Sequence, residues 1–94
     1  MNDMVLSQAT MDILLERRRQ IEAEGFDVRH DDAQDTGSMA RAAAAYIMNQ
    51  FIRPGCPVWW PWDITWWKPK NRRRDLVRAA ALIIAELEKL DRKR

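Results

Sequence analysis

The segment RRRDLVRAAALIIAELEKLD, residues 72–91, sets the fold of this chain. Alanine, leucine and glutamate favour helix, and Asn71 just before the segment is a good N-cap residue. Apolar residues recur every three or four positions, which is the repeat of one helix face. That face holds Leu76, Ala80, Ile83, Leu87 and Leu90, and it is widened by Val77, Ala81 and Ile84. We therefore expect a long helix whose apolar stripe packs on two partners.

A first helix is expected over residues 11–24, capped by Ser7 or Thr10. Its inward residues would be Met11, Leu14, Leu15 and Ile21. Gly25 suits the left-handed residue that ends a helix, after which Phe26 can fold back on the last turn. The basic triplet Arg17-Arg18-Arg19 would lie mostly on the solvated side of this helix.

A second helix is expected over residues 39–51, because alanines 42–45 favour helix and Pro54-Gly55 ends it. Asp35, Thr36 or Ser38 could cap this helix, although it could also begin earlier, near Asp31. The segment PVWWPWDITWWKP, residues 57–69, follows with all five tryptophans and three of the four prolines. Proline at these intervals forbids a long helix and disfavours a central strand, so we expect an ordered irregular loop.

The predicted fold class is therefore all-α, a three-helix domain with a long Trp/Pro-rich connection between helices 2 and 3. Residues 1–94 form one domain whose core is thin. The composition, 47% hydrophobic and 32% charged, is that of a globular protein. A single cysteine, no membrane-length apolar run and no signal peptide predict a cytoplasmic protein without a membrane partner. The thin core, the opposed charges and the many indoles favour a homo-oligomer.

The charges are unevenly distributed although their formal sum is only +2. The segment from residue 53 to residue 74 contains six basic residues and one acidic residue, Asp63. The segment from residue 22 to residue 35 contains six acidic residues and one basic residue, Arg29. This polarity could steer an anion to one face of the protein. It could equally pair two faces of the chain, or two copies of it. Nucleic acid is disfavoured as a partner, because the net charge is low and no helix carries a regular basic stripe.

Three arginines at the start of the last helix are the leading candidate for a ligand site. Free amides and guanidinium groups together bind phosphate or carboxylate well. Indoles beside cations are also suited to stacking on a base. The candidate ligand-binding residues are Arg72, Arg73, Arg74, Lys68, Lys70, Trp60, Trp62, Trp66 and Trp67. Alternatively, the arginines pair with the acidic segment, and two or three of the indoles complete the core.

Other chemistry has weaker support in the sequence. His30-Asp31-Asp32, with Glu22, Glu24 or Asp35, could hold magnesium or manganese, or Asp31 and Asp32 could simply sit at a helix start. We assign no metal, no cofactor and no catalytic residue. The sequence has one histidine, no nucleophilic serine in a strand-turn-helix motif and no glycine-rich phosphate-binding loop. Cys56 is expected to be a packing residue.

Three segments taken together carry a resemblance: ERRRQIEAEG at 16–25, His30-Asp31-Asp32 with the helix to Tyr46, and WPWD and WWKP followed by RRDLV at 73–77. In this order they resemble a family of small, mostly uncharacterised proteins of tailed bacteriophages and prophages. The resemblance runs from about Asp12 to Asp91. The residue before the histidine is usually acidic in that family, whereas here it is Arg29, which weakens a metal site built around His30.

The resemblance implies a phage or prophage origin and a bacterial host cell, but no particular reaction. By analogy of context alone, phage genomes are rich in small anti-defence proteins. The leading expectation is a non-enzymatic binding protein that captures a phosphate-bearing, nucleotide-type signal. The alternatives are an inhibitor directed at a host defence protein, a structural phage protein, and a metal-dependent enzyme like the nucleotide pyrophosphohydrolases that uses Glu22, His30, Asp31 and Asp32.

Overall fold

The computed structural model describes residues 6–34, 37–49, 52 and 54–93. The described residues form helices α1 (Gln8–Ala23), α2 (Val28–Ala33), α3 (Ser38–Met48) and α4 (Arg72–Arg92), and the short 3-10 helix η1 (Ile64–Trp66). These residues contain no strand, so the predicted all-α class is confirmed. The structure differs from the expected three helices by α2, a separate helix formed by the acidic segment.

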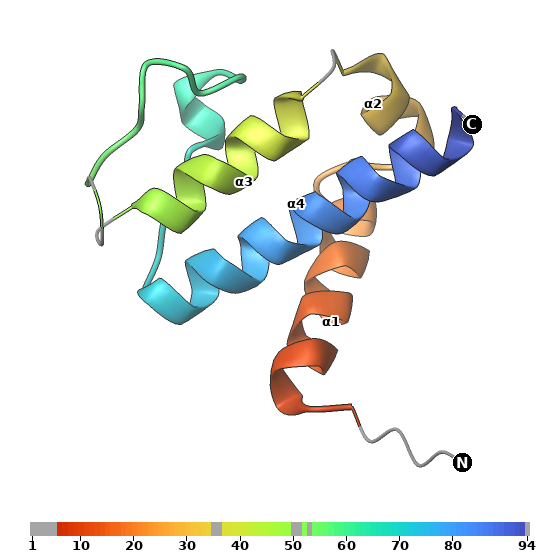
Figure 1. Ribbon diagram of the computed structural model, residues 1–94, viewed down its shortest axis with the longest axis horizontal. Helices are drawn as coiled ribbons and strands as arrows, with labels where there is room; N and C mark the ends of the chain where they lie inside the picture. The colour runs from red at the N-terminus through yellow and green to blue at the C-terminus, as the bar shows by residue number, and fades with distance from the viewer. Residues whose placement is uncertain (1–5, 35–36, 50–51, 53, 94) are drawn as a thin grey trace.

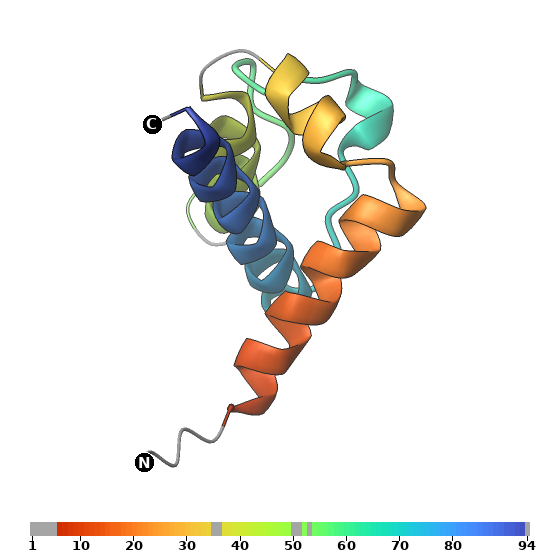
Figure 2. The same ribbon diagram turned by 90° about the vertical axis from the view of Figure 1, so that its right-hand side faces the viewer.

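Helix α4 lies at the centre of the molecule (Figure 1). Helix α3 runs alongside it, α1 crosses it, and α2 lies near its C-terminal end. The tryptophan-containing connection passes over α3 and returns to the start of α4. The N-terminal turns of α1 extend away from the other helices (Figure 2). None of the described helices is long and apolar enough to cross a membrane.

Short-range signals determine where the helices begin and end. Ser7 accepts the N–H of Thr10 at 3.1 Å and Asn71 accepts that of Arg74 at 2.8 Å, so both predicted caps are confirmed. Gly25 is left-handed, with φ of 74°, and Phe26 then donates its N–H to the carbonyl of Gln20. The predictions at residues 35–36 and 50–51 lie outside the described residues, and α3 ends at Met48.

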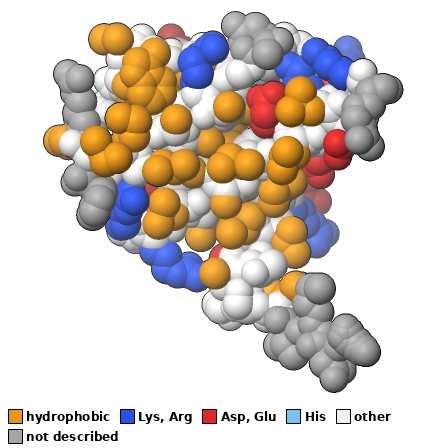
Figure 3. All heavy atoms as spheres, viewed as in Figure 1, with side chains coloured by type: hydrophobic (Ala, Val, Ile, Leu, Met, Phe, Trp, Pro, Cys, Tyr) orange, Lys and Arg blue, Asp and Glu red, His pale blue; other side chains and the backbone are white. Residues whose placement is uncertain are grey.

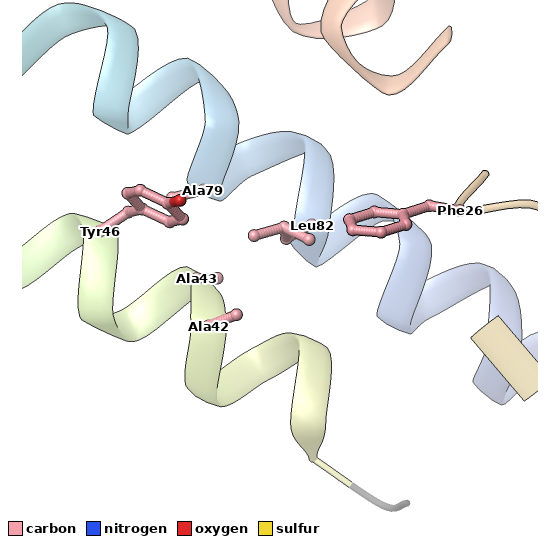
Figure 4. Packing of buried hydrophobic residues seen from close by; sticks show 6 residues of the cluster. All are labelled: Phe26, Ala42, Ala43, Tyr46, Ala79 and Leu82. Carbon is pink, nitrogen blue, oxygen red and sulfur yellow. The ribbon is translucent and has the colours of Figure 1, made fainter. Parts of the chain in front are cut away.

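Helices α3 and α4 pack closely because alanines meet between them (Figure 4). The buried cluster consists of Phe26, Ala42, Ala43, Tyr46, Ala79 and Leu82. Trp60, Trp62 and Trp67 pack against this cluster, whereas Trp59 and Trp66 remain 39% and 40% exposed. The prediction that two or three indoles complete the core is therefore confirmed.

The predicted inward face of the first helix is wrong, and that of the last helix is wrong in part. Met11, Leu14, Leu15 and Ile21 of α1 are all at least 38% exposed, and its buried residues are Glu16, Arg17 and Gln20. On α4 the predicted inward residues Leu76, Ile83, Leu87 and Leu90 are at least 40% exposed, whereas Val77 and Ala81 of the same predicted stripe are buried. The helices meet instead through small residues and through ion pairs. Large aliphatic side chains are consequently left on the outer surface, where they form an apolar band over α4 (Figure 3).

The close approach of α3 to α4 predicts a sharp size limit at Ala42, which is fully buried. We expect Ala42→Leu to lower the free energy of unfolding by about 1–3 kcal/mol, because extra methyl groups displace packed neighbours. Ala40→Leu, at an exposed position of the same helix, is the matched control and should change stability by less than about 0.5 kcal/mol. Urea denaturation measures both, and equal effects would contradict the alanine contact.

Candidate ligand-binding site

An aromatic pocket of about 240 Å³ opens between the end of α1, α2 and the tryptophan connection. We call it the aromatic pocket and define it by its lining residues, which are Glu24, Phe26, His30, Trp62, Asp63 and Trp66. Binding sites that enclose a whole drug-sized ligand commonly have about 300–1,000 Å³. The aromatic pocket therefore has room for one ring system, with the remainder of a larger ligand outside it.

The aromatic rings of this pocket face one another from different segments. Phe26 stacks on His30, with centroids 4.3 Å apart and planes 9° from parallel. Trp62 and Trp66 lie 5.6 and 5.7 Å from Phe26, both tilted against it. Phe26 is buried and belongs to the core cluster, whereas Trp66 is partly open to solvent. The pocket thus has one fixed ring at its base and an accessible indole at its edge.

A second cavity of about 20 Å³ adjoins the aromatic pocket and shares Glu24, Phe26, Trp62 and Trp66 with it. Its volume is close to that needed for one water-sized group. Gln20 lines this cavity and is only 1% exposed. The Gln20 Nε2 donates to Glu16 at 3.3 Å, but its Oε1 is buried without a hydrogen-bond partner. An unsatisfied buried acceptor beside a cavity is a place for a donor to bind.

Charged groups surround the two cavities. The Lys68 Nζ lies 5.3 Å from the centroid of the Trp66 ring, and the Arg78 guanidinium lies 5.1 Å from that of Tyr46. Burial raises the pKa of Tyr46 above its ordinary value, and its hydroxyl donates to the carbonyl of Trp66 at 3.3 Å. Glu24 lines both cavities and accepts one hydrogen bond of 2.8 Å from Arg19.

A buried polar network holds the pocket walls in place. Arg17 donates to the carbonyl of Phe26 at 3.2 Å, to Asp31 at 2.8 Å and to Glu88 at 3.0 Å. Asp31 is fully buried and also contacts the Nδ1 of His30 at 2.9 Å. Three helices are thereby joined through one guanidinium, and Phe26 and His30 are fixed at the base of the pocket.

The network continues from His30 to the tryptophan connection. Gln34 accepts the indole N–H of Trp62 at 2.7 Å, and its amide nitrogen lies 3.3 Å from the Nε2 of His30. These contacts fit the arrangement in which His30 donates from Nδ1 to Asp31 and accepts the Gln34 amide at Nε2. Gln34 is the C-cap residue of α2, so the end of α2 orients Trp62. The two residues are 28 positions apart in the sequence.

The structure brings two of the three candidate arginines together, because Arg73 and Arg74 line one cavity of about 250 Å³ that is also lined by Arg19 and by their carboxylate partners. Arg72 donates to the carbonyl of Ile47. Arg73 pairs with Asp12 at 2.9 Å, and Arg74 pairs with the buried Glu16 at 2.7 Å. The alternative in which the arginines pair with carboxylates of the same chain therefore describes Arg73 and Arg74, although their partners belong to α1 and not to the predicted acidic segment.

The other candidate ligand residues divide between the core and the pocket. Trp60 and Trp67 pack around Tyr46, with centroid distances of 5.7 and 4.8 Å. Trp62 and Trp66 line the aromatic pocket, and Lys68 lines the adjoining cavity. Lys70 is exposed and lines neither, and its backbone N–H donates to Asp75 at 2.7 Å.

The acidic residues named for metal binding are engaged by arginines. Arg17 binds Asp31, Arg92 binds Asp32 at 2.7 Å, and Arg18 binds Glu22 at 3.3 Å. Within the part of the chain that the structure describes, no three histidine, cysteine or acidic side chains lie together as metal ligands would. The geometry thus gives the enzyme alternative no support from these residues.

Sequence reasoning missed Gln20 and Phe26 as site residues. Gly25-Phe26 was interpreted only as a helix stop, yet the same turn carries Phe26 into the pocket. Gln20 gave no signal, because an isolated glutamine in a helix is ordinarily solvated. Comparison of the chain with models of protein families, with curated proteins and with solved structures finds no match.

The buried carboxylate of Glu16, which pairs with Arg19 and Arg74, predicts a dependence of stability on pH. Burial acts to raise the pKa of Glu16, but hydrogen bonds from Arg19 and Arg74 outweigh it and hold the pKa below its ordinary value of 4.5. Its stabilising contribution is therefore complete above about pH 4.5 and is lost as the pH falls through the lower folded-state pKa. We expect Glu16→Gln to cost about 3 kcal/mol at neutral pH, as for a broken buried ion pair, and to weaken the loss of stability in acid.

Urea denaturation between about pH 3 and pH 7 measures both effects. Glu22→Gln is the control, because Glu22 is exposed and its partner Arg18 is exposed as well. A Glu16→Gln protein whose stability falls in acid as steeply as that of the unmodified protein would contradict this role for Glu16.

Proposed function

We propose that this protein is a non-enzymatic binding protein that captures a small ligand in the aromatic pocket. The observation that carries the proposal is the convergence of Phe26, His30, Trp62 and Trp66 around one opening. Rings at these distances form a stacking surface for a planar group, and each stacked base is worth about 1–3 kcal/mol. A nucleotide is the ligand class we favour, with its base in the pocket and its phosphate outside.

The polar groups around the pocket suggest how such a ligand would be oriented. Glu24 lines the aromatic pocket as an acceptor, and it suits a ring edge that carries N–H or amino groups. Lys68 lies beside Trp66 and would bind a phosphate that extends from the pocket. Asp63 at the opening would disfavour a second anionic group there. The site would therefore accept a base with a donor edge and few phosphates.

The resemblance to phage and prophage proteins gives this activity a biological setting. A small protein that holds a nucleotide signal without transforming it would remove that signal from a host defence pathway. The arginine and carboxylate pairs described above supply no acid, base or metal arrangement for turnover, which favours capture over catalysis.

Binding to a host defence protein is the second candidate, and a separate surface favours it. The connection after α3 exposes Val58 fully and Trp59 in part, beside a groove of about 170 Å³ lined in addition by Met48 and Cys56. Exposed aromatic residues of this kind are common binding hot spots. This surface shares no lining residue with the aromatic pocket, so substitutions can separate the two candidates.

The capture proposal predicts that Trp66→Ala weakens nucleotide binding about 5- to 150-fold, the range that corresponds to the loss of one stacking contact. Lys68→Ala should weaken it about 10-fold or more for phosphorylated ligands only, because a charge-assisted bond is lost. Isothermal titration with nucleosides, nucleoside monophosphates and cyclic dinucleotides measures these affinities. Native mass spectrometry of protein purified from a bacterial host identifies any ligand that is already held.

Matched controls exist for both substitutions. Trp59→Ala removes an indole of nearly the same exposure outside the pocket, and Lys70→Ala removes a lysine two positions away. Both should bind as the unmodified protein does. Equal losses for Trp59→Ala and Trp66→Ala would contradict the pocket assignment. An unmodified protein that binds none of these ligands would contradict capture and favour the Trp59 surface.

A further inference from the structure

The small cavity beside the aromatic pocket has the features of a specificity subsite. Its volume of about 20 Å³ is close to that of one water-sized group. Glu24, Phe26, Trp62 and Trp66 line both this cavity and the aromatic pocket, so the two spaces adjoin. The cavity is also lined by residues of the buried cluster shown in Figure 4, and we call it the inner cavity. A ligand in the aromatic pocket can therefore reach it with one small substituent.

A buried acceptor, the side-chain oxygen of Gln20, belongs to the inner cavity. Gln20 lines the cavity and is only 1% exposed. Its Nε2 lies 3.3 Å from a carboxylate oxygen of Glu16 and 3.5 Å from the carbonyl oxygen of Arg78, and both of these groups only accept. The amide nitrogen therefore belongs on that side, which leaves Oε1 for the cavity. No group of the described residues donates to this buried atom, and such an acceptor costs free energy until a donor reaches it.

A second acceptor lies one helical turn from Gln20. Residues four apart in a helix share one face, and Glu24, which follows the last residue of α1, lines the same cavity. The carboxylate of Glu24 accepts one hydrogen bond from Arg19, at 2.8 Å, and has further acceptor capacity. Two acceptors thus line one small space. That arrangement suits a group that carries two N–H donors, and a primary amino group is the smallest of this kind.

The charges at the inner cavity favour a neutral donor over an ammonium or metal ion. Lys68 and Arg78 line the cavity together with the single carboxylate of Glu24. A further positive charge would therefore be repelled. An amino group on an aromatic ring is neutral at ordinary pH, because its lone pair is delocalised into the ring, and it lies in the ring plane. A ring held in the aromatic pocket would carry such a group into the inner cavity.

We propose that the inner cavity is the subsite that recognises an exocyclic amino group of the captured base, with Gln20 as the specificity-determining residue. The inference rests on the proposed capture of a nucleotide in the aromatic pocket. The amino group donates one N–H to the Oε1 of Gln20 and the other to Glu24. A base with an oxo group at that position sets one acceptor against another and leaves Gln20 without a donor. The ligand class is thereby narrowed to nucleotides with an amino-substituted base, such as adenine or cytosine.

Isothermal titration of the unmodified protein with two pairs of nucleotides tests the proposal. Inosine monophosphate has an oxo group where adenosine monophosphate has an amino group, and uridine and cytidine monophosphate differ in the same way. We expect the amino member of each pair to bind at least about 10-fold more tightly, because the oxo member leaves a buried acceptor unpaired. The phosphate and the ring size are the same within a pair, so the ratio isolates the subsite. The pair that binds more tightly decides the outcome.

Gln20→Met is the matching variant, because methionine is also unbranched and lacks the amide oxygen. We expect it to lower the affinity for adenosine monophosphate about 10-fold and to leave that for inosine monophosphate unchanged. Gln8→Met, at an exposed position of the same helix, is the control and should keep the preference. Circular dichroism checks that both variants fold. If Gln20→Met does not fold, the comparison of nucleotides on the unmodified protein still decides.

The outcomes separate this inference from the proposed function on which it rests. Equal affinities for the amino and oxo members would overturn the subsite and leave capture in the aromatic pocket standing. A preference that persists in Gln20→Met would overturn the role of Gln20. An unmodified protein that binds none of the four nucleotides would overturn both proposals.

Discussion

The buried guanidinium of Arg17 is the constraint on which the rest of the structure depends. It binds the carbonyl of Phe26, the carboxylate of Asp31 and the carboxylate of Glu88. A buried charge is costly unless it is paired and its donors are satisfied, so these partners must come to Arg17 together. That requirement fixes the turn after α1, the position of α2 and the crossing of α1 over α4. The base of the aromatic pocket, Phe26 and His30, follows from the same bonds.

Polar burial between α1 and α4 explains why the outer surface is apolar. Glu16, Gln20 and Arg78 occupy the space between these helices that aliphatic side chains fill in an ordinary bundle. On the other side of α4, alanines allow α3 to approach closely and leave no room for larger residues. Leucines and isoleucines of both helices are consequently outside. Polar side chains on one side of α4 and alanines on the other therefore account for both the thin core and the exposed apolar face of α4.

Local signals made much of the fold predictable. Ser7, Gly25 and Asn71 act on groups within a few residues of themselves, so the helix boundaries that they set followed from the sequence. The faces of the helices did not follow, because an apolar stripe ordinarily indicates the inner side. Here that side is decided by ion pairs between residues 58 or 71 positions apart, such as Arg74 with Glu16. Periodicity contains no information about such partners.

The candidate site was predictable only in part for a related reason. Trp62, Trp66 and Lys68 were singled out because indoles beside cations suit stacking and phosphate binding. Trp60 and Trp67 carry the same local signal, yet they pack around Tyr46 in the core. Trp62 is held at the pocket by a bond to Gln34, the C-cap residue of α2, which is 28 positions away in the chain. The unpartnered Oε1 of Gln20 results from the way the helices pack, and no pattern in the sequence predicts it.

The aromatic pocket and the exposed apolar face of α4 are linked through one turn of α4. Leu87 belongs to that face, and the adjacent Glu88 binds Arg17, which supports Phe26 in the pocket. Proximity alone does not couple two sites, because coupling requires an element with two arrangements that both sites bias. Arg17 is fully engaged by its partners, and α4 is continuous from Arg72 to Arg92. The bonds of Arg17 therefore fix the position of Phe26 relative to α4, and they do not by themselves make the pocket respond to a partner on the outer face of α4.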